Sequence, residues 1–509
     1  MPTLFTVLRS HAEQLKQQKS KQQAIVGELP VRRVSGIGAQ LSAVVAESAP
    51  RRKKTKEPNP RLSLKDRFRI VGKPSPNLHV IVVGAGFAGL SAAYELQSVG
   101  YKVTVIEAQA EVGGRVDSRR DVVPGRVMEG GAELIGLNHL AWWSYKHKFG
   151  LQFTRLSDSE NSPVILGGDR LAPAAAARLS REMDKAQSLI SRVARAVNAD
   201  EPWRTPGARK LDRRSLTSGL NSIPMSRLCR LAFLEQLQAD NGVEARRQSW
   251  LGNLAMIKGG GLGKYWTETE THHCKGGNQQ LAFKFKAKLK QLKLGKPVRG
   301  IHIDRNGLTV ILQRGKPVRG TDVVLALPPT RWRDIDFKPP LPKTYDVQFG
   351  QNVKYLLNVQ NGCWRPAGPD MSSDGPIDLT WEGTDGRRGS RVGFVAFSGA
   401  TDAVTCGGWK NRRKKYLAEL APVYPRLKRG SRNGLFMDWP KNKWTRGSYS
   451  FPKPGEVTRV GPLLRSGFKQ RVHFAGEHTC YAFTGYMEAA LQSGLRIAEY
   501  LARRDQVIQ

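Results

Sequence analysis

The most regular hydrophobic pattern of the chain lies between His79 and Glu107. An unbroken apolar run, Val80 to Val83, has the length of a buried parallel strand. A helical pattern from Leu90 to Val99 follows it, and then a second apolar run from Lys102 to Ile106. This order predicts a βαβ unit, in which a helix joins and covers two parallel strands.

Short apolar runs and helical repeats predict further elements along the chain. Strands are expected at Val298–Asp304, Leu308–Gln313, Asp322–Leu327, Gln351–Val359 and Arg471–Phe474. Arg305-Asn306-Gly307 separates the first two strands and is typical of a hairpin turn. Helices are expected at Leu4–Gln23, His139–Gly150, Ala172–Asn198, a lysine-rich stretch ending at Leu292, and a C-terminal stretch in which Met487, Ala490, Leu491, Gly494, Leu495 and Ala498 share one face.

The turn of the βαβ unit carries the spacing GxGxxG, as Gly84-Ala85-Gly86-Phe87-Ala88-Gly89. Gly84 permits a tight turn, Gly86 lets the backbone approach a pyrophosphate, and Gly89 lets helix and strand pack closely. The helix N-terminus attracts phosphate groups. Glu107 ends the second strand, where a carboxylate can accept hydrogen bonds from ribose hydroxyls. Together these residues predict a dinucleotide site.

A second glycine pair follows, as Gly113-Gly114-Arg115. Two glycines bring backbone close to a ligand, and Arg115 can pair with a diphosphate through two N–H groups. This block resembles flavoproteins more than nicotinamide dehydrogenases. The alternative is a glycine-rich turn with a solvated arginine.

Composition excludes several classes of protein. No apolar run approaches 18 residues, so no membrane-spanning helix is expected. The first residues lack the pattern of a secretory signal, and a transit peptide is the alternative interpretation of this segment. Five scattered cysteines without a CxxC pair argue against a disulfide framework and for a reducing, cytoplasmic compartment. His272-His273-Cys274 has no second ligand cluster, so no metal site is expected.

The net charge of +39 is unusual for a chain of 509 residues. Residues 1–77 carry 16 Lys and Arg against 5 Asp and Glu, so the rest of the chain holds most of the excess. A surface of this kind attracts polyanions such as nucleic acid. The alternative is a generally basic composition, because no nucleic-acid-binding module is recognisable. The sequence does not decide whether the protein forms a homo-oligomer.

Seven blocks in this order resemble the flavin amine oxidase family, which includes monoamine oxidases, polyamine oxidases and L-amino-acid oxidases. The blocks are GAGFAGL, EVGGRV, EGGAELIG, KGGNQQL, FGQNVKYLL, TRGSYS and FAGEHT followed by TGYMEAALQSG. The resemblance covers residues 79–504.

The resemblance implies an α/β fold with a Rossmann-like FAD-binding domain built from discontinuous segments and an inserted α+β substrate domain. The FAD-binding domain would comprise residues 77–152, 272–340 and 441–504, and the substrate domain residues 153–271 and 341–440. Residues 1–76 are expected to form a mobile basic extension, because they carry the run Arg51-Arg52-Lys53-Lys54 and a proline-bounded linker.

Family positions also imply roles for single residues. Lys354 would hold a water near the flavin, while Tyr449 and Tyr486 would enclose the substrate amine. The residues implied in FAD binding are Gly84, Gly86, Ala88, Gly89, Glu107, Arg115, Gly131, Val298, Gly476, Glu477 and Met487. Ser448 stands where monoamine oxidases carry the cysteine that is bonded to flavin, so noncovalent FAD is expected.

These features predict an FAD-dependent oxidase that converts an amine or amino acid to an imine while O₂ becomes H₂O₂. An L-amino-acid oxidase with an unusual carboxylate clamp is one alternative, because Glu133-Leu134-Ile135 occupies the usual place of the clamping arginine. Others are a flavoprotein that docks on a polyanion and a carotenoid-desaturase-like enzyme. Few acids are expected near the cavity, which ranks polyamines below monoamines and amino acids as substrates.

Overall fold

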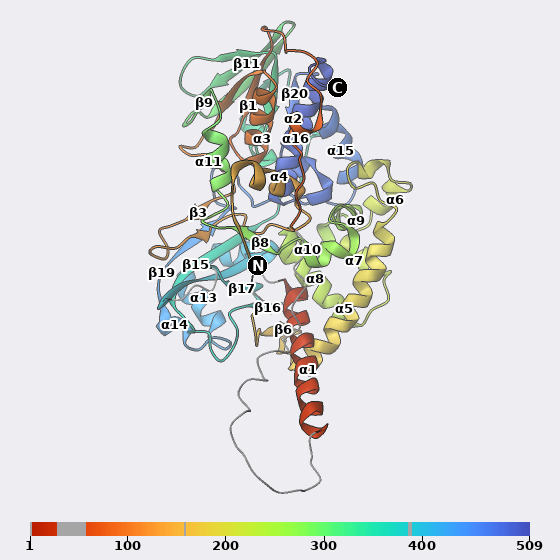
Figure 1. Ribbon diagram of the computed structural model, residues 1–509, viewed down its shortest axis with the longest axis vertical. Coiled ribbons are helices and arrows are strands. Elements are labelled where there is room, and N and C mark those ends of the chain that lie inside the picture. Colours follow the sequence, from red (N-terminus) through yellow and green to blue (C-terminus); the bar gives the residue numbers. More distant parts are fainter. Residues whose placement is uncertain (1–2, 28–56, 157–158, 385–388) are drawn as a thin grey trace, which may run out of the picture.

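The computed structural model describes residues 3–27, 57–156, 159–384 and 389–509, and it has two halves stacked along its long axis (Figure 1). The upper half in this view contains β1, α3 and α16, and the C-terminus lies there. The lower half contains β15 on one side and the helices α5 and α8 on the other. The functional residues expected from the sequence come from both halves.

A five-stranded parallel sheet forms the centre of the upper half. Its order is β20-β13-β1-β2-β9, with β1 at His79–Val83, β2 at Lys102–Ile106, β9 at Leu292–Lys293, β13 at Asp322–Leu325 and β20 at Val472–Phe474. Val80 pairs with Val103 on one side and with Asp322 on the other, both in parallel. The strands come from three separate stretches of the chain, and the expected α/β fold with a Rossmann-like sheet is confirmed.

Both faces of this sheet are covered, which explains the unbroken apolar runs. Val80 and Val82 pack against α3 (Phe87–Ser98) and α16 (Met487–Arg504). Ile81 and Val83, which point to the opposite face, pack against a mixed sheet of β10 (Val298–Asp304), β11 (Gly307–Leu312), β12 (Val318–Gly320) and β14 (Asp336–Lys338), in which only the β10–β14 pair is parallel. The two helices touch closely, because a Cβ atom at Gly494 would lie 2.5 Å from the Ala88 carbonyl oxygen.

The lower half is built on a mixed seven-stranded sheet in the order β19-β15-β18-β17-β16-β6-β7. The central strand β15 (Asn352–Gln360) lies between β18 (Arg391–Gly399) and β19 (Ser431–Asp438), and all its residues except Gln360 are buried. The other strands are β6 (Val164–Leu166), β7 (Asp169–Arg170), β16 (Met371–Ser373) and β17 (Leu379–Glu382).

Helices beside this sheet form a second core. They include α5 (Pro173–Ala194), α8 (Arg227–Asn241), α9 (Trp250–Gly259) and α10 (Tyr265–Glu268). These helices, together with β15, bring residues of the two inserts to the cavity described below.

The lysine-rich helix is shorter than the sequence predicts. Helix α11 spans Gln280–Lys286, and the chain then forms β9, in which Leu292 pairs with Val105 of β2. Pairing with the edge of the parallel sheet therefore overrides the helical propensity of the lysines.

Part of residues 1–76, which the sequence predicts to form a mobile extension, packs against the folded body in the structure. Helix α1 spans Leu4–Gly27, and Leu4, Phe5, Val7 and Leu8 are buried in the core that contains α5. Leu64 is also fully buried, with its N–H donated to Glu95 at 2.8 Å. The apolar spacing of the first turns accounts for this docking. The basic run at residues 51–54 lies outside the described residues.

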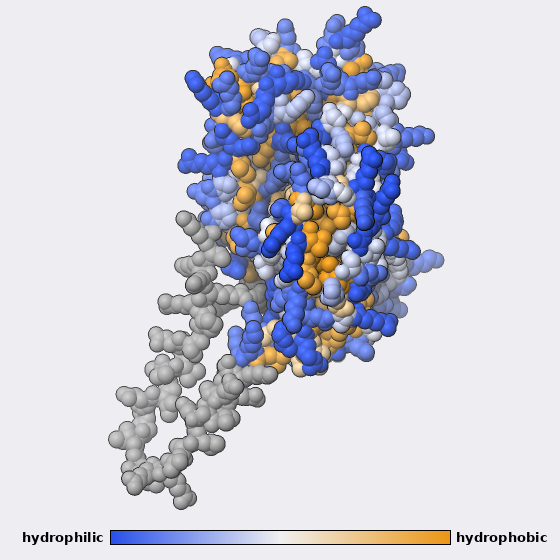
Figure 2. Space-filling view, turned by 90° about the vertical axis from the view of Figure 1, so that its right-hand side faces the viewer, coloured by the Kyte–Doolittle hydropathy of each residue, from blue (hydrophilic) through white to orange (hydrophobic). Residues whose placement is uncertain are grey.

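The cysteines, the helices and the surface of the described residues bear on the classes of protein considered above. All five cysteines are buried and none forms a disulfide. Within the described ranges, no helix combines the length and apolarity that crossing a bilayer requires, and no group of three metal-ligating side chains occurs. Figure 2 shows one face on which hydrophilic residues surround a central hydrophobic area.

Candidate active site

One long cavity runs from the β1–α3 turn to β15, and it collects nearly all the candidate residues. Gly89 is the exception: it does not line the cavity, and a Cβ atom there would lie 2.0 Å from the Gly84 carbonyl oxygen, which fits its predicted packing role. The candidates that line the cavity are Gly84, Gly86, Ala88, Glu107, Arg115, Gly131, Val298, Lys354, Tyr449, Gly476, Glu477, Tyr486 and Met487.

At one end of the cavity, Glu107 follows β2 and is held by backbone N–H groups. Its Oε2 accepts from Ala85 N at 2.6 Å, and its Oε1 accepts from Gln109 N at 2.8 Å. Burial raises the pKa of this carboxyl group above its usual value. A Cβ atom at Gly86 would meet nothing nearer than 4.0 Å, so open space faces the start of α3. This end can hold a ribose and a pyrophosphate as predicted.

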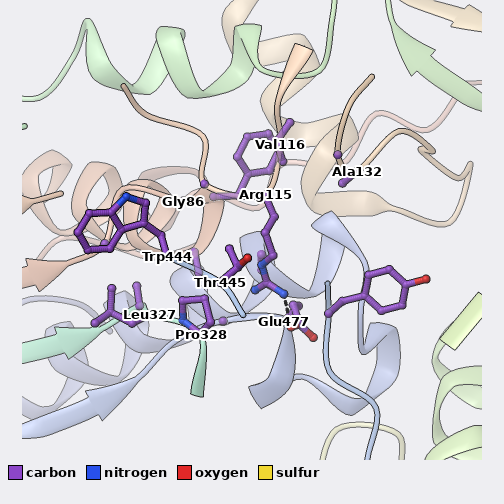
Figure 3. Close-up of a pocket in the computed structure, with 18 of the residues that line it drawn as sticks. Gly86, Arg115, Val116, Ala132, Leu327, Pro328, Trp444, Thr445 and Glu477 are labelled. Atoms are coloured by element: carbon purple, nitrogen blue, oxygen red, sulfur yellow. Dashed lines mark hydrogen bonds and ion pairs between the residues drawn. The ribbon is translucent and has the colours of Figure 1, made fainter. Parts of the chain in front are cut away.

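In the middle of the cavity, Arg115 lies against Glu477 (Figure 3). Arg115 Nη1 donates to Glu477 Oε1 at 2.8 Å and to the Ser448 carbonyl oxygen at 2.9 Å. Burial alone would raise the pKa of Glu477, but Arg115, His478 and the hydrogen bond from Ser450 together outweigh burial and hold the pKa below its usual value. Glu477 also accepts from Ser450 Oγ at 2.6 Å, which fixes both oxygens. Helix α16 begins beside this pair, at Met487.

Further along, Lys354 of β15 lies under the loop that follows β4 (Met128–Glu129). Its Nζ donates to Glu133 Oε2 at 2.8 Å and to the carbonyl oxygens of Gly131 at 2.9 Å and Glu129 at 3.2 Å. The two charged side chains are 9% and 8% exposed. Burial alone would raise the pKa of Glu133, but the pKa lies below its usual value because nearby positive groups, chiefly Lys354 through its charge and its hydrogen bond, together outweigh burial.

Two tyrosines line the end of the cavity beyond Lys354. Tyr486, the residue before α16, donates from its hydroxyl to Glu270 Oε1 at 3.0 Å. Tyr449 lies beside Gly485, whose Cβ atom would be 3.3 Å from the Tyr449 ring. The structure therefore brings both predicted tyrosines to one end of the cavity.

Three carboxylates line the same end, and sequence reasoning missed two of them. Asp240 lies in the last turn of α8, and Glu270 lies two residues after the end of α10. The third carboxylate is that of Glu133, which is paired with Lys354. Burial and the neighbouring Glu270 raise the pKa of Asp240 well above its usual value. Burial and Glu133 raise that of Glu270, whose Oε2 is buried without a hydrogen-bond partner among the described residues.

The expectation of few acids near the cavity is therefore wrong. Asp240 and Glu270 are 30 positions apart in an insert that carries no motif, so only their three-dimensional proximity identifies them. For Glu133 the sequence did offer an indication of a place near the cavity, because this residue stands inside the EGGAELIG block.

Comparisons with known proteins agree with the geometry. Residues 87–502 match the family model described as flavin containing amine oxidoreductase. The flavin-containing amine oxidase B of Cavia porcellus is 27% identical and aligns with 82% of this chain and 85% of its own length. An L-amino acid dehydrogenase of Synechocystis sp. is 25% identical over 83% of this chain and 94% of its own.

A solved structure shares the architecture. Wild-type putrescine oxidase bound to putrescine superposes with a TM-score of 0.76 at 25% identity, covering 84% of this chain and 99% of that one.

Proposed function

This chain belongs to the family of flavin-containing amine oxidoreductases, and we propose that it is an oxidase of cationic primary amines that uses noncovalent FAD and O₂. One observation carries the choice of substrate. The cavity end with Tyr449 and Tyr486 carries three carboxylates, of Glu133, Asp240 and Glu270. Besides burial, the negative charge of Glu270 raises the pKa of Asp240, and that of Glu133 raises the pKa of Glu270. An ammonium group placed among these acids would relieve their repulsion, whereas the carboxylate of an amino acid would add to it.

The basic groups of the cavity support the same choice. Among the described lining residues they are Lys296, Lys354, Arg115 and Arg331. Lys354 pairs with Glu133, Arg115 with Glu477, and Arg331 with Asp334 at 2.6 Å. Lys296 lies at the end of the cavity that would hold the ribose, because its backbone N–H donates to the carbonyl oxygen of Glu107. None of these is an uncommitted clamp for a substrate carboxylate beside the tyrosines.

The residues of the long cavity fit FAD. Glu107 suits a ribose, the open space at Gly86 suits a pyrophosphate, and the start of α16 suits the electron-rich edge of a flavin ring. When bound, FAD supplies the acceptor for the hydride equivalent that leaves the amine α-carbon, and O₂ takes the electrons to give H₂O₂. No described lining residue is a cysteine, and Ser448 occupies the position at which a covalent link is expected in monoamine oxidases.

The protein would bind the amine, orient it and take its proton. Tyr449 and Tyr486 offer ring walls that hold the α-carbon in place. The ammonium donates to Glu270 Oε2, the buried oxygen without a partner. Transfer of that proton to the carboxylate leaves a neutral amine with a free electron pair, and the raised pKa of Glu270 favours the transfer. Water then hydrolyses the imine product to a carbonyl compound and ammonia.

A peroxide-coupled panel tests this proposal. Purified, flavin-loaded protein is assayed with n-alkylamines, benzylamine, α,ω-diamines and L-amino acids. Peroxide formation with amines and none with amino acids is expected, and Glu270→Gln should raise KM by about tenfold, the cost of one lost charge-assisted hydrogen bond of about 1.5 kcal/mol. Glu268→Gln is the matched control, because Glu268 is two positions away and does not line the cavity. Turnover of amino acids alone would contradict the proposal and favour the L-amino-acid oxidase alternative.

A further inference from the structure

A second, smaller cavity adjoins the amine end of the long one. Asp240, Glu270 and Tyr486 line both cavities, so the two meet at these side chains. Phe5 and Thr6 of the first turn of α1 also line the smaller cavity, together with Thr3 just before the helix. Figure 1 shows that α1 begins near the middle of the molecule and runs down alongside α5.

The first turn of α1 is held firmly in the wall of this cavity. Phe5 is 5% exposed, and its ring lies edge-on to Trp266 with centroids 5.3 Å apart. It also packs on Phe233 at the same centroid distance. Trp266 itself lines the smaller cavity. The Phe5 ring is therefore a fixed part of the wall and not a loosely placed side chain.

A hydrogen-bond chain joins α1 to the acids. The Leu4 N–H donates to Gln236 Oε1, and Gln236 Nε2 donates to Asp240 Oδ1 at 2.5 Å. Further along the helix, Arg9 pairs with Asp184 at 2.9 Å, and the His11 ring contacts the Ser162 carbonyl oxygen at 2.7 Å. The start of α1 thus fixes the side chain of Asp240 as well as the space in front of it.

Helix α1 precedes the stretch that matches the family model, which begins at residue 87. This wall is therefore contributed by a part of the chain outside the family domain. A substrate that extended past Tyr486 and Glu270 would enter the smaller cavity, of which Phe5 forms part of the wall.

We propose that α1 is a specificity-determining segment, in which Phe5 closes the outer end of the amine cavity and limits the length of amine that the enzyme accepts. This inference rests on the proposed amine oxidase function. Phe5 is the residue that sets the limit, because among the described side chains of α1 it is the one large apolar group that lines the smaller cavity. Gln236 has a positioning role, through Asp240.

The test compares wild type, Phe5→Ala and Phe5→Leu with n-alkylamines from propylamine to decylamine. Removal of the ring should move the best substrate to longer chains, with kcat/KM for the longest amine rising about tenfold relative to the shortest, within the range that a few methylene groups in a pocket produce. Phe5→Leu should give an intermediate shift. Val7→Ala is the matched control, because Val7 is equally buried on α1 but does not line the cavity.

Flavin content and the rise in Tm caused by each amine are measured on the same samples. An unchanged length profile in flavin-loaded Phe5 variants would overturn the role of α1 while leaving the amine oxidase function intact. If no protein turned over any amine, the proposed function would fail. A Tm response that shifted to longer amines in the Phe5 variants would then still support the α1 wall, and an unchanged response would overturn it.

Discussion

The ammonium of Lys354 and the carboxylate of Glu133 lie 2.8 Å apart in the wall of the cavity, and both are almost completely buried. The lysine makes two further bonds to carbonyl oxygens, so all three of its N–H groups have protein acceptors. Glu133 in turn accepts from Trp381 Nε1 at 2.9 Å. Lys354 thus fixes the side chain of Glu133, while the predicted role of Lys354 in holding a water stays a prediction.

Lys354→Met should destabilise the protein and slow turnover. Removal of one partner leaves a buried charge unpaired, which costs about 3–5 kcal/mol. The pKa of Glu133, which Lys354 now holds down, should then rise. Urea unfolding and stopped-flow measurement of both half-reactions check this. The double variant Lys354→Met/Glu133→Gln should recover most of the stability, because no charge is left unpaired. Normal rates in both half-reactions would limit Lys354 to a structural role.

Glu107→Ala should weaken FAD binding by about 1.5–3 kcal/mol, the contribution of a charge-assisted hydrogen bond to a ribose hydroxyl. The affinity is measured by titrating apoprotein with FAD and following flavin fluorescence. Glu111→Ala is a suitable control, since Glu111 is close in sequence but forms a surface ion pair with Lys286. Equal FAD affinity in both variants would show that Glu107 serves only to hold the N–H groups of Ala85 and Gln109.

The parts of this fold that the sequence predicts are those in which local pattern and tertiary role coincide. The βαβ unit is one, because strand, glycine turn and helix follow each other within 30 residues and are buried on both faces. Helix α1 shows the opposite case: its apolar spacing predicts the helix, but nothing local indicates that Phe5 reaches the cavity. Asp240 and Glu270 could not be predicted, since their meeting depends on how α8 and α10 pack.

The flavin should be released when the protein is denatured. Ser448 donates its hydroxyl hydrogen to Asn352 Oδ1, and Cys480 contacts Gln492 at 3.5 Å and does not line the cavity. The described residues that line the cavity therefore include no cysteine that could form a thioether bond to the flavin. Acid precipitation, followed by measurement of the visible flavin absorbance of both fractions, should find the flavin in the supernatant. Yellow colour that remains in the washed pellet would contradict a noncovalent cofactor.

Stability should fall as the pH rises from about 5 to 8, in part because of Glu456. Burial raises the pKa of this carboxyl group to about 8, from 4.5 in the unfolded chain. Between these two values the folded protein holds a proton that the unfolded chain has released, so the free energy of unfolding decreases as the pH increases. Glu456→Gln should flatten this dependence, because an amide can accept the same N–H groups without ionising.

Tm values at pH 5, 6, 7 and 8 measure the effect, with Glu419→Gln as an exposed control. The advantage of Glu456→Gln over wild type should grow steadily towards pH 8. A constant difference across the four pH values would mean that Glu456 does not titrate in this range.

The net charge of +39 and the cavity acids act on a cationic substrate in opposite directions, and ionic strength should separate them. The whole-protein field repels a cation over a Debye length of about 30 Å at 10 mM salt, but over only about 8 Å at 150 mM. Glu133, Asp240 and Glu270 act at short range in a buried site, where salt screens little. We expect kcat/KM to rise with salt, and to rise more for butane-1,4-diamine than for n-butylamine, because the diamine carries twice the charge. Glu270→Gln should lower kcat/KM for both amines without changing the salt dependence. A diamine kcat/KM that fell as salt was added would show that the cavity acids, and not the basic surface, control the approach of the substrate.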